Sequence, residues 1–285
     1  MRLEDITTIG VIGAGTMGQG IAQICAQAGY KTILFDINAQ VLEKAEKTTL
    51  DNLNKGIARG KLTEAERDAA LANLAYTADT LQLSCHVIVE AVVERLEVKQ
   101  SIFQELASIN TPDTILASNT SSIPITQIAA KVPHPERVVG MHFFNPAHIM
   151  KLVEVISGAA TAPEVAHTIK ALAEKLGKTA VMAKDSPGFI VNRVARHFYV
   201  EALKLLEEGV ADVETIDKLM QASGFKMGPF ELMDLIGVDT NYAVTTSMYE
   251  AFQYDPKFRP NRIQQQKVDA GHHGRKSGKG FYTYA

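Results

Sequence analysis

Short apolar runs alternate along the first 184 residues with stretches in which apolar side chains recur every three or four positions. Continuous apolar runs are typical of parallel strands buried on both faces, and the longer recurrence is typical of helices that pack on a sheet. We therefore predict an α/β, Rossmann-like domain over residues 1–184, built on a doubly wound, mostly parallel sheet. The predicted strands cover residues 9–12, 32–35, 74–76, 86–91, 114–117, 137–141, 151–156 and 179–183.

Two helices interrupt this alternation after the second strand. Asn38 is a typical N-cap for an amphipathic helix over Ala39–Ala58, and Gly60 ends that pattern. Thr63 and Glu66 have the spacing of a capping box, which predicts the start of a second helix. Two helices exceed what a crossover connection needs, so we expect them to project from the sheet as an inserted helical hairpin.

The pattern changes at residue 185, after which helical spacing continues without any predicted strand. Ser186 and Pro187 are typical of a helix start, and the first long helix is predicted to run from Gly188 to Glu208. Shorter helices are predicted over residues 212–222, 229–235, 239–254 and 261–270. Residues 185–285 are therefore a predicted all-helical domain, and because so small a domain covers its core poorly, we expect a homodimer formed through it.

Composition excludes several classes of partner. The chain is 46% hydrophobic and 21% charged with a net charge of −3, so it offers no basic surface for nucleic acid or for a membrane. No apolar run has the length of a membrane span, and the N-terminus has the pattern of neither a signal peptide nor a transit segment. Cys25 and Cys85 lie in apolar contexts, so we expect buried free thiols and no metal site. These features favour the cytoplasm.

Three glycines join the first strand to the first helix with the spacing G-x-G-x-x-G. Gly13 permits the sharp turn, Gly15 leaves room for a pyrophosphate, and Gly18 lets the helix pack closely on the strand. Asp36 ends the second strand, where a carboxylate accepts the hydroxyls of an adenosine ribose and repels a 2′-phosphate. A glycine-rich turn that binds nothing is the alternative, but the order of strand, helix, strand and acid favours NAD.

Polar clusters, SNTSS and HFFNP, follow two of the predicted strands, where ligands bind in α/β sheets. Histidine titrates near neutral pH, so we predict that His142 transfers the hydroxyl proton of a substrate. Glu154 lies inside an adjacent apolar run, where an unpaired carboxylate is costly, so we predict that it orients the imidazole. The alternatives are a histidine bonded only to backbone and a glutamate that faces solvent. Ser121 and Asn192 are candidates for holding the substrate oxygen.

The segments that carry these residues resemble the L-3-hydroxyacyl-CoA dehydrogenase family, and specifically its bacterial 3-hydroxybutyryl-CoA dehydrogenase branch. They span nearly the whole chain: VIGAGTMGQGIAQ, VEAVVERLEVK, ASNTSS, GMHFFNP, MKLVEVI, DSPGFIVNR and GRKSGKGFYTY. The resemblance implies NAD-dependent oxidation of a (3S)-3-hydroxyacyl-CoA in a cleft between the two domains. It implies that His142 is the base, that Glu154 orients it, and that Ser121 and Asn192 hold the substrate oxygen.

The resemblance also implies which residues contact the cofactor and the CoA group. The implied cofactor set is Gly13, Gly15, Thr16, Met17, Gly18, Asp36, Glu94, Lys99, Asn119, Ser121 and Asn145. CoA contacts in this family come from the hairpin, which favours Lys55, although basic residues there are also typical of a solvated helix face. His148 departs from the commoner family segment NPVPVM and so affects the predicted shape of the substrate pocket.

Two other functions fit the same predicted scaffold. One is a dehydrogenase of a free hydroxy acid or sugar acid, similar to the gulonate dehydrogenases. The other is a non-catalytic regulator that binds NADH. The intact set of His142, Glu154, Ser121 and Asn192 favours an enzyme over the regulator.

Overall fold

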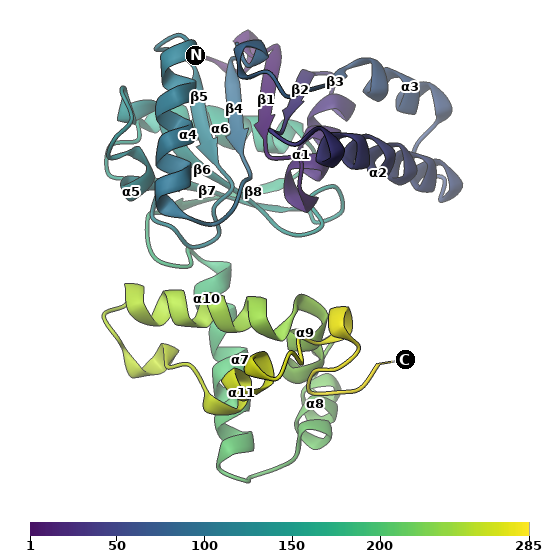
Figure 1. Ribbon diagram of the computed structural model, residues 1–285, viewed down its shortest axis with the longest axis vertical. Helices are drawn as coiled ribbons and strands as arrows, with labels where there is room; N and C mark the ends of the chain where they lie inside the picture. The colour runs from purple at the N-terminus through teal and green to yellow at the C-terminus, as the bar shows by residue number, and fades with distance from the viewer. Residues whose placement is uncertain (285) are drawn as a thin grey trace. The chain divides into compact units, whose positions relative to one another are not determined.

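The computed structural model describes residues 1–284, and the chain divides into two compact units. The first unit comprises Met1–Phe189, and the second begins at Ile190 (Figure 1). The turn over residues 185–189 thus belongs to the first unit, whereas the sequence predicts the boundary after residue 184. Within residues 1–284, no helix combines the length and the apolarity that crossing a membrane requires.

An eight-stranded sheet forms the first unit, in the order β3-β2-β1-β4-β5-β6-β7-β8. Strands β1 to β6 are parallel, whereas β7 pairs antiparallel with β6 and parallel with β8. The predicted doubly wound, mostly parallel sheet is therefore confirmed. The strands are β1 Thr8–Ile12, β2 Lys31–Phe35, β3 Leu74–Thr77, β4 Val87–Glu90, β5 Ile115–Ser118, β6 Val138–Phe143, β7 Leu152–Ser157 and β8 Thr179–Lys184.

Helices cover both faces of this sheet (Figure 1). One buried apolar cluster includes side chains from α1 (Thr16–Gln27) and α6 (Pro163–Lys175). The other includes side chains from α4 (Leu96–Ile109) and α5 (Ile125–Ala129). The five-residue α5 is absent from the sequence prediction. The Asp185 carboxylate holds the start of α5 by accepting hydrogen bonds from the first two backbone amides of that helix.

The predicted helical hairpin is confirmed as α2 (Ala39–Ala58) and α3 (Glu64–Ala72), which project from the sheet beside β3 (Figure 1). The Asn38 side chain accepts a hydrogen bond from the Gln40 amide, as an N-cap does. Thr63 and Glu66 form the predicted capping box. Local signals in the sequence therefore define both arms of the hairpin.

Helices dominate the second unit. They are α7 Val191–Glu207, α8 Val213–Ala222, α9 Pro229–Ile236, α10 Val238–Ala251 and α11 Arg262–Asp269. Short 3-10 turns complete the chain: η1 Leu3–Asp5, η2 Thr80–Gln82, η3 Pro135–Arg137, η4 Pro256–Phe258 and η5 Arg275–Ser277. Among the described residues of this unit, β-type pairing is limited to isolated bridges near residues 274–283. The predicted helical domain is therefore confirmed.

The predicted start of the first long helix is wrong. Helix α7 begins at Val191, and its N-cap, Ile190, makes no side-chain capping hydrogen bond. Gly188 and Phe189 both have positive φ angles, of 70° and 49°, which a right-handed helix does not allow. The residue types of Ser186 and Pro187 match a helix start, but the chain makes a left-handed turn before the helix begins.

Candidate active site

The glycine loop has the geometry that a dinucleotide phosphate needs. Gly13 has φ 94°, and a Cβ there would lie 2.8 Å from the carbonyl oxygen of Ala91. A Cβ on Gly18 would lie 1.7 Å from the carbonyl oxygen of Gly13, so α1 packs directly on the end of β1. Gly15 is exposed, and a Cβ there would contact nothing within 4 Å, which leaves the first amides of α1 open to an anion. Thr16 is likewise exposed at the helix start.

Asp36 connects the end of β2 to the glycine loop. Its Oδ2 accepts a hydrogen bond of 2.9 Å from the Ala14 amide, and its Oδ1 accepts one of 3.0 Å from the Asn38 amide. Each carboxylate oxygen keeps further acceptor capacity for ribose hydroxyls. The half-buried carboxylate is therefore fixed in place on the β2 side of the loop.

His142 and Glu154 form a buried pair because of the strand register. In the antiparallel pairing of β6 with β7 the two residues lie directly opposite each other, so their side chains share one face. His142 Nδ1 lies 2.8 Å from Glu154 Oε2, and both side chains are almost completely buried. A carboxylate only accepts hydrogen bonds, so Nδ1 carries the proton and the lone pair of the neutral ring is on Nε2. His142 lies inside β6, whereas the sequence predicts that the strand ends one residue earlier.

Two aromatic rings confine the imidazole. The ring of Phe144 lies 4.5 Å from that of His142, and the ring of Phe189 lies 5.8 Å away, measured between centroids. Phe189 is 4% exposed and comes from the left-handed turn at the end of the first unit. Neither ring was predicted as part of the site. These two ring contacts and the hydrogen bond to Glu154 together limit the rotation of the imidazole.

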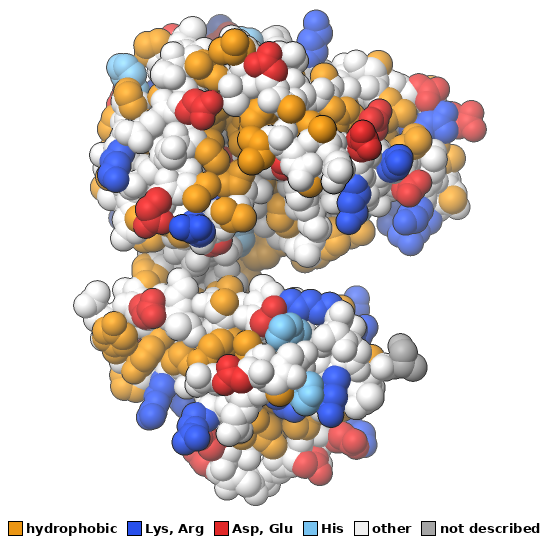
Figure 2. Space-filling model, viewed as in Figure 1, with side chains coloured by type: hydrophobic (Ala, Val, Ile, Leu, Met, Phe, Trp, Pro, Cys, Tyr) orange, Lys and Arg blue, Asp and Glu red, His pale blue; other side chains and the backbone are white. Residues whose placement is uncertain are grey.

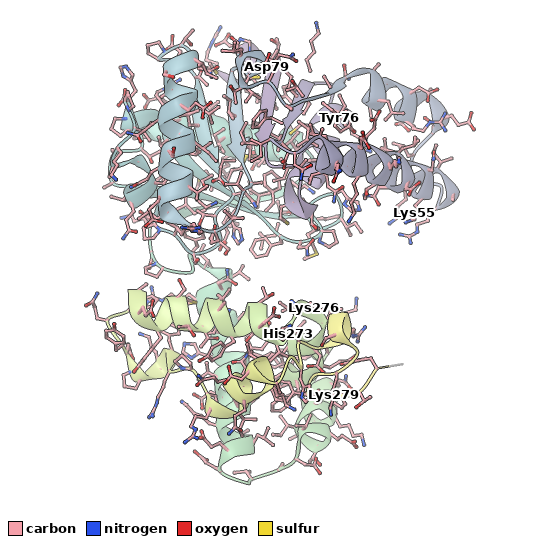
Figure 3. The ribbon with its side chains drawn as sticks, in the orientation of Figure 1. Lys55, Tyr76, Asp79, His273, Lys276 and Lys279 are labelled. Carbon is pink, nitrogen blue, oxygen red and sulfur yellow. The ribbon has the colours of Figure 1, made fainter. Side chains whose placement is uncertain are left out.

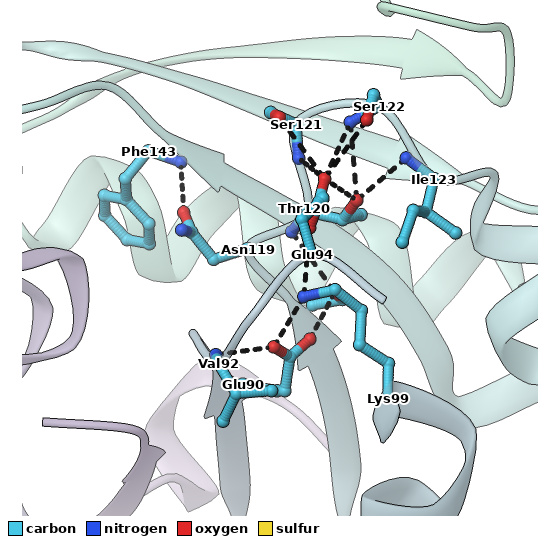
Figure 4. Close-up of polar contacts among 11 residues, drawn as sticks. Glu90, Val92, Glu94, Lys99, Asn119, Thr120, Ser121, Ser122, Ile123 and Phe143 are labelled. Atoms are coloured by element: carbon cyan, nitrogen blue, oxygen red, sulfur yellow. Dashed lines mark hydrogen bonds and ion pairs between the residues drawn. The ribbon is translucent and has the colours of Figure 1, made fainter. Parts of the chain in front are cut away.

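The loop after β5 winds around one carboxylate oxygen of Glu94 (Figure 4). Five donors converge on Glu94 Oε1: Thr120 Oγ1 at 2.7 Å, Ser121 N at 2.8 Å, Ser122 N at 3.1 Å, Ser121 Oγ at 3.2 Å and Ser122 Oγ at 3.3 Å. Burial tends to raise the pKa of Glu94, but the ammonium of Lys99 and the Thr120 and Ser121 donors outweigh it and lower the pKa below its usual value. Glu94 therefore stays ionised and fixes the position of Ser121.

Lys99 is buried inside the protein. Its ammonium is 2.6 Å from Glu90 Oε1 and 3.2 Å from Glu94 Oε2. Glu90, at the end of β4, also accepts hydrogen bonds from Val92 N at 2.8 Å and Ser118 Oγ at 2.6 Å. Glu90 was not predicted as a site residue, although an acid at the end of an apolar strand was the available signal. The ammonium thus joins two carboxylates at the end of β4, and Glu90 links that end to Ser118 at the end of β5.

Asn119 and Asn145 differ in their surroundings. Asn119 follows β5, and its Oδ1 accepts a hydrogen bond of 2.8 Å from the Phe143 amide, which ties the ends of β5 and β6 together (Figure 4). Asn145 follows β6 and is exposed. The segment that follows Asn145 is held by the buried ammonium of Lys178, which donates to the carbonyl oxygens of Ala147 at 2.6 Å and Met150 at 2.9 Å. The segment after β6 is therefore also held in place by hydrogen bonds.

His148, which departs from the family pattern, lies on the fixed segment beside α1. A Cβ added to Gly20 would lie 3.2 Å from the Cβ of Ala147 and 3.6 Å from His148 Nδ1, so α1 lies directly against this segment. Burial and the nearby Lys178 ammonium lower the pKa of His148. The lowered pKa favours the neutral form of the ring.

The remaining predicted residues lie elsewhere. Met17 is partly buried against the apolar core in the first turn of α1. Lys55 is exposed on the hairpin arm α2 (Figure 3). Asn192 is in the first turn of α7, in the second unit. The structure therefore brings together His142, Glu154, Ser121, Glu94, Lys99 and Asn119 at the carboxyl ends of β4 to β6, with the glycine loop and Asp36 at the ends of β1 and β2.

The chain matches two family profiles along almost its whole length. The profile described as "3-hydroxyacyl-CoA dehydrogenase, NAD binding domain" matches residues 8–186, and the C-terminal domain profile of the same family matches residues 188–284. The 3-hydroxyadipyl-CoA dehydrogenase of Escherichia coli K12 is 48% identical over 98% of this chain, which spans 59% of that protein. A probable 3-hydroxybutyryl-CoA dehydrogenase of Bacillus subtilis is 44% identical over 98% of both chains.

Solved structures agree. The crystal structure of (S)-3-hydroxybutyryl-CoA dehydrogenase from Ralstonia eutropha is 40% identical, with a TM-score of 0.95 over 98% of this chain and 99% of that one. The first unit is thus an NAD-binding domain, and the polar clusters at its strand ends lie where that fold binds its ligands. The chain belongs to the 3-hydroxyacyl-CoA dehydrogenase family.

Proposed function

We propose that this protein oxidises the (3S)-hydroxyl group of a short-chain 3-hydroxyacyl-CoA, of which 3-hydroxybutyryl-CoA is the type, and catalyses the reverse reduction. The observation that carries the proposal is the buried pair of His142 Nδ1 and Glu154 Oε2 at 2.8 Å. Family membership supports the acyl-CoA class of substrate. When bound, NAD+ supplies the acceptor for the hydride that leaves C3 of the substrate.

In this mechanism His142 moves one proton. The lone pair on Nε2 takes the proton of the 3-hydroxyl group, and the ring becomes an imidazolium. Glu154 accepts the Nδ1 hydrogen bond throughout, so it stabilises the positive charge as that charge forms. In the reverse direction the imidazolium returns the proton to the oxygen of the ketone. A general acid–base group of this kind contributes roughly 10²–10⁴ to the rate.

Two polar side chains are proposed to hold the substrate oxygen. Ser121 is supported by its fixed place beside Glu94, on the loop after β5. Asn192 is supported by the family resemblance of its segment, DSPGFIVNR. The Ser121 hydroxyl and the Asn192 NH2 group are hydrogen-bond donors. Donors of this kind stabilise the substrate oxygen most when negative charge develops on it.

Lys55 is proposed to contact a phosphate of CoA. Lys and Arg side chains gather with acidic ones near the free end of the hairpin (Figure 2), and Lys55 is exposed in the last turn of α2. We expect Lys55→Glu to raise KM for acetoacetyl-CoA about fivefold, because a repulsive charge replaces an attractive one at an exposed site. A truncated pantetheine thioester, which lacks the nucleotide phosphates, is the control, and its KM should not change. Equal changes in both KM values would contradict the contact.

One assay tests the proposed reaction. Purified protein is given NADH and, in separate reactions, acetoacetyl-CoA, 3-oxohexanoyl-CoA, 3-oxoadipyl-CoA and free acetoacetate, and NADH consumption is measured. We expect turnover of the CoA thioesters and none of the free acid. Turnover of the free acid alone would favour the hydroxy-acid dehydrogenase, and NADH binding without any turnover would favour the regulator. The 3-oxoadipyl-CoA reaction is included because the E. coli relative bears the name of that substrate's reduced form.

Asp36 is proposed to set the preference for NAD over NADP. We expect Asp36→Ala to reduce the ratio of kcat/KM for NADH to that for NADPH by about tenfold, because a 2′-phosphate no longer meets a carboxylate. Asp36→Asn keeps an acceptor for the Ala14 amide, so it separates the loss of charge from any loosening of the loop. An unchanged ratio in both variants would rule out the ribose contact.

A homodimer formed through the second unit is also proposed. Large apolar side chains there are exposed, including Val194 at 69%, Leu219 at 69% and Phe225 at 50%, and orange side chains are prominent on its visible face (Figure 2). Sedimentation equilibrium would show twice the mass of the chain. We also propose a cytoplasmic location, which the two buried free thiols, Cys25 and Cys85, support and cell fractionation would test.

A further inference from the structure

The cluster of Glu90, Lys99 and Glu94 does not balance its own charge. It contains two carboxylates and one ammonium, joined by contacts of 2.6 Å and 3.2 Å, so one negative charge remains. The side chains of Glu90 and Lys99 are 0% and 1% exposed, whereas that of Glu94 is 36% exposed. The excess charge therefore reaches the surface of the site through Glu94.

Glu94 holds this charge in a fixed position. Its Oε1 accepts the hydrogen bonds from Thr120, Ser121 and Ser122, and its Oε2 faces Lys99 (Figure 4). A carboxylate bound on both oxygens does not turn toward solvent when a ligand arrives. Charge that is fixed in a partly buried place acts more strongly on a neighbouring ligand than charge on a mobile surface side chain.

The position of Glu94 in the sheet indicates which part of a dinucleotide it faces. Asp36 follows β2, on one side of β1, whereas Glu94 follows β4 and His142 lies on β6, both on the other side. The glycine loop lies between them, since a Cβ on Gly13 would meet the Ala91 carbonyl at 2.8 Å just beyond β4. A dinucleotide with its adenosine at Asp36 and its pyrophosphate at the loop has its nicotinamide on the β4 to β6 side.

We propose that the uncompensated charge of this cluster, presented by Glu94, shifts the relative affinity of the site toward NAD+ and away from NADH. The oxidised nicotinamide ring carries one positive charge and the reduced ring carries none, so a nearby carboxylate distinguishes the two. Glu94 is thus a residue that sets the relative affinity for the two redox states of the cofactor, in addition to positioning Ser121. This inference rests on the proposed function, because it needs the nicotinamide to lie beside His142.

The ratio of two dissociation constants tests the inference without any turnover. We expect Glu94→Gln to raise Kd for NAD+ about fivefold and to change Kd for NADH by less than about twofold. Glu94→Asp disturbs the loop but keeps the charge, so the ratio of the two Kd values should stay near that of the parent. Glu97→Gln removes the same charge from an exposed position on α4 and should also leave the ratio unchanged.

Calorimetric titration gives each Kd, and circular dichroism verifies the folding of each variant. If Glu94→Gln does not fold, Glu90→Gln removes the same charge from the buried end of the cluster and should shift the ratio in the same direction. Equal weakening of NAD+ and NADH in the charge-removing variants would overturn the inference and leave Glu94 with a positioning role only. A parent protein that binds neither NAD+ nor NADH would instead overturn the proposed function. A preserved shift in a protein that reduces no acyl-CoA would reject the substrate and keep the inference.

Discussion

Replacing His142 by glutamine is expected to lower kcat for acetoacetyl-CoA reduction by at least about a hundredfold. Glutamine is similar in length and keeps an amide N–H for Glu154, so the surrounding strands and rings need not move. It has no group that titrates near neutral pH, so it neither donates nor takes the proton of the substrate. Stopped-flow and steady-state NADH consumption give kcat, and fluorescence titration gives the affinity for NADH, which should be retained.

A second histidine provides the control for this variant. His167 is exposed on α6 and has no contact with the residues at the strand ends among those described, and His167→Gln should leave kcat within about twofold of the parent. If the His142 variant kept kcat within a few-fold of the parent, another group would have to transfer the proton. If it lost NADH affinity as well, the loss of turnover would reflect a damaged binding site.

Much of the fold was predictable because its signals are local. The Asn38 cap and the Thr63–Glu66 capping box act within a few residues, and the structure contains both. Part of the glycine loop is equally local, since Gly18 is required by its contact with the Gly13 carbonyl, whereas Gly13 also depends on Ala91, just beyond β4. The bounds of α2 agree with the sequence prediction at both ends for this reason.

The pairing of His142 with Glu154 was predictable only in part. The sequence shows that both residues lie in apolar strands, but it shows neither that β7 runs antiparallel to β6 nor which residues lie opposite. A shift of one residue in this register would turn the Glu154 side chain to the other face of the sheet. The pair therefore depends on the turn between the strands, which Lys178 holds from a distant part of the chain.

Charged residues in the core were the least predictable feature. Lys99 occupies a helix that also contains exposed charged residues, and nothing in its local sequence separates it from them. Its burial depends on Glu90 and Glu94 meeting it from β4 and the following loop. The start of α7 was mispredicted for a similar reason. Ser186 and Pro187 are residue types of a helix start, but only the folded chain shows that a left-handed turn follows them.

Replacing Lys99 by methionine is expected to destabilise the protein by about 3–5 kcal/mol, the cost of breaking a buried ion pair. Methionine fills most of the space of the lysine stem but provides no charge, so Glu90 remains fully buried with only the hydrogen bonds from Val92 and Ser118. Urea unfolding followed by circular dichroism measures the change. Lys170→Met, which breaks an exposed pair with Glu174 on α6, is the matched control and should cost less than about 1 kcal/mol.

The double variant Lys99→Met with Glu90→Gln separates charge from packing. Glutamine keeps an acceptor oxygen for the Val92 amide, its NH2 group donates to the Ser118 hydroxyl, and it removes the isolated charge, so we expect it to restore more than half of the lost stability. The stability of the parent would then depend on the pairing of Lys99 with Glu90, although an uncharged pair at these two positions is nearly as stable. No recovery in the double variant would mean that the lysine stem, not its ammonium, holds the ends of β4 and β5 together. The double variant keeps the net charge of −1, now carried by Glu94 alone. We therefore expect the ratio of Kd values for NAD+ and NADH to stay near that of the parent while the stability changes.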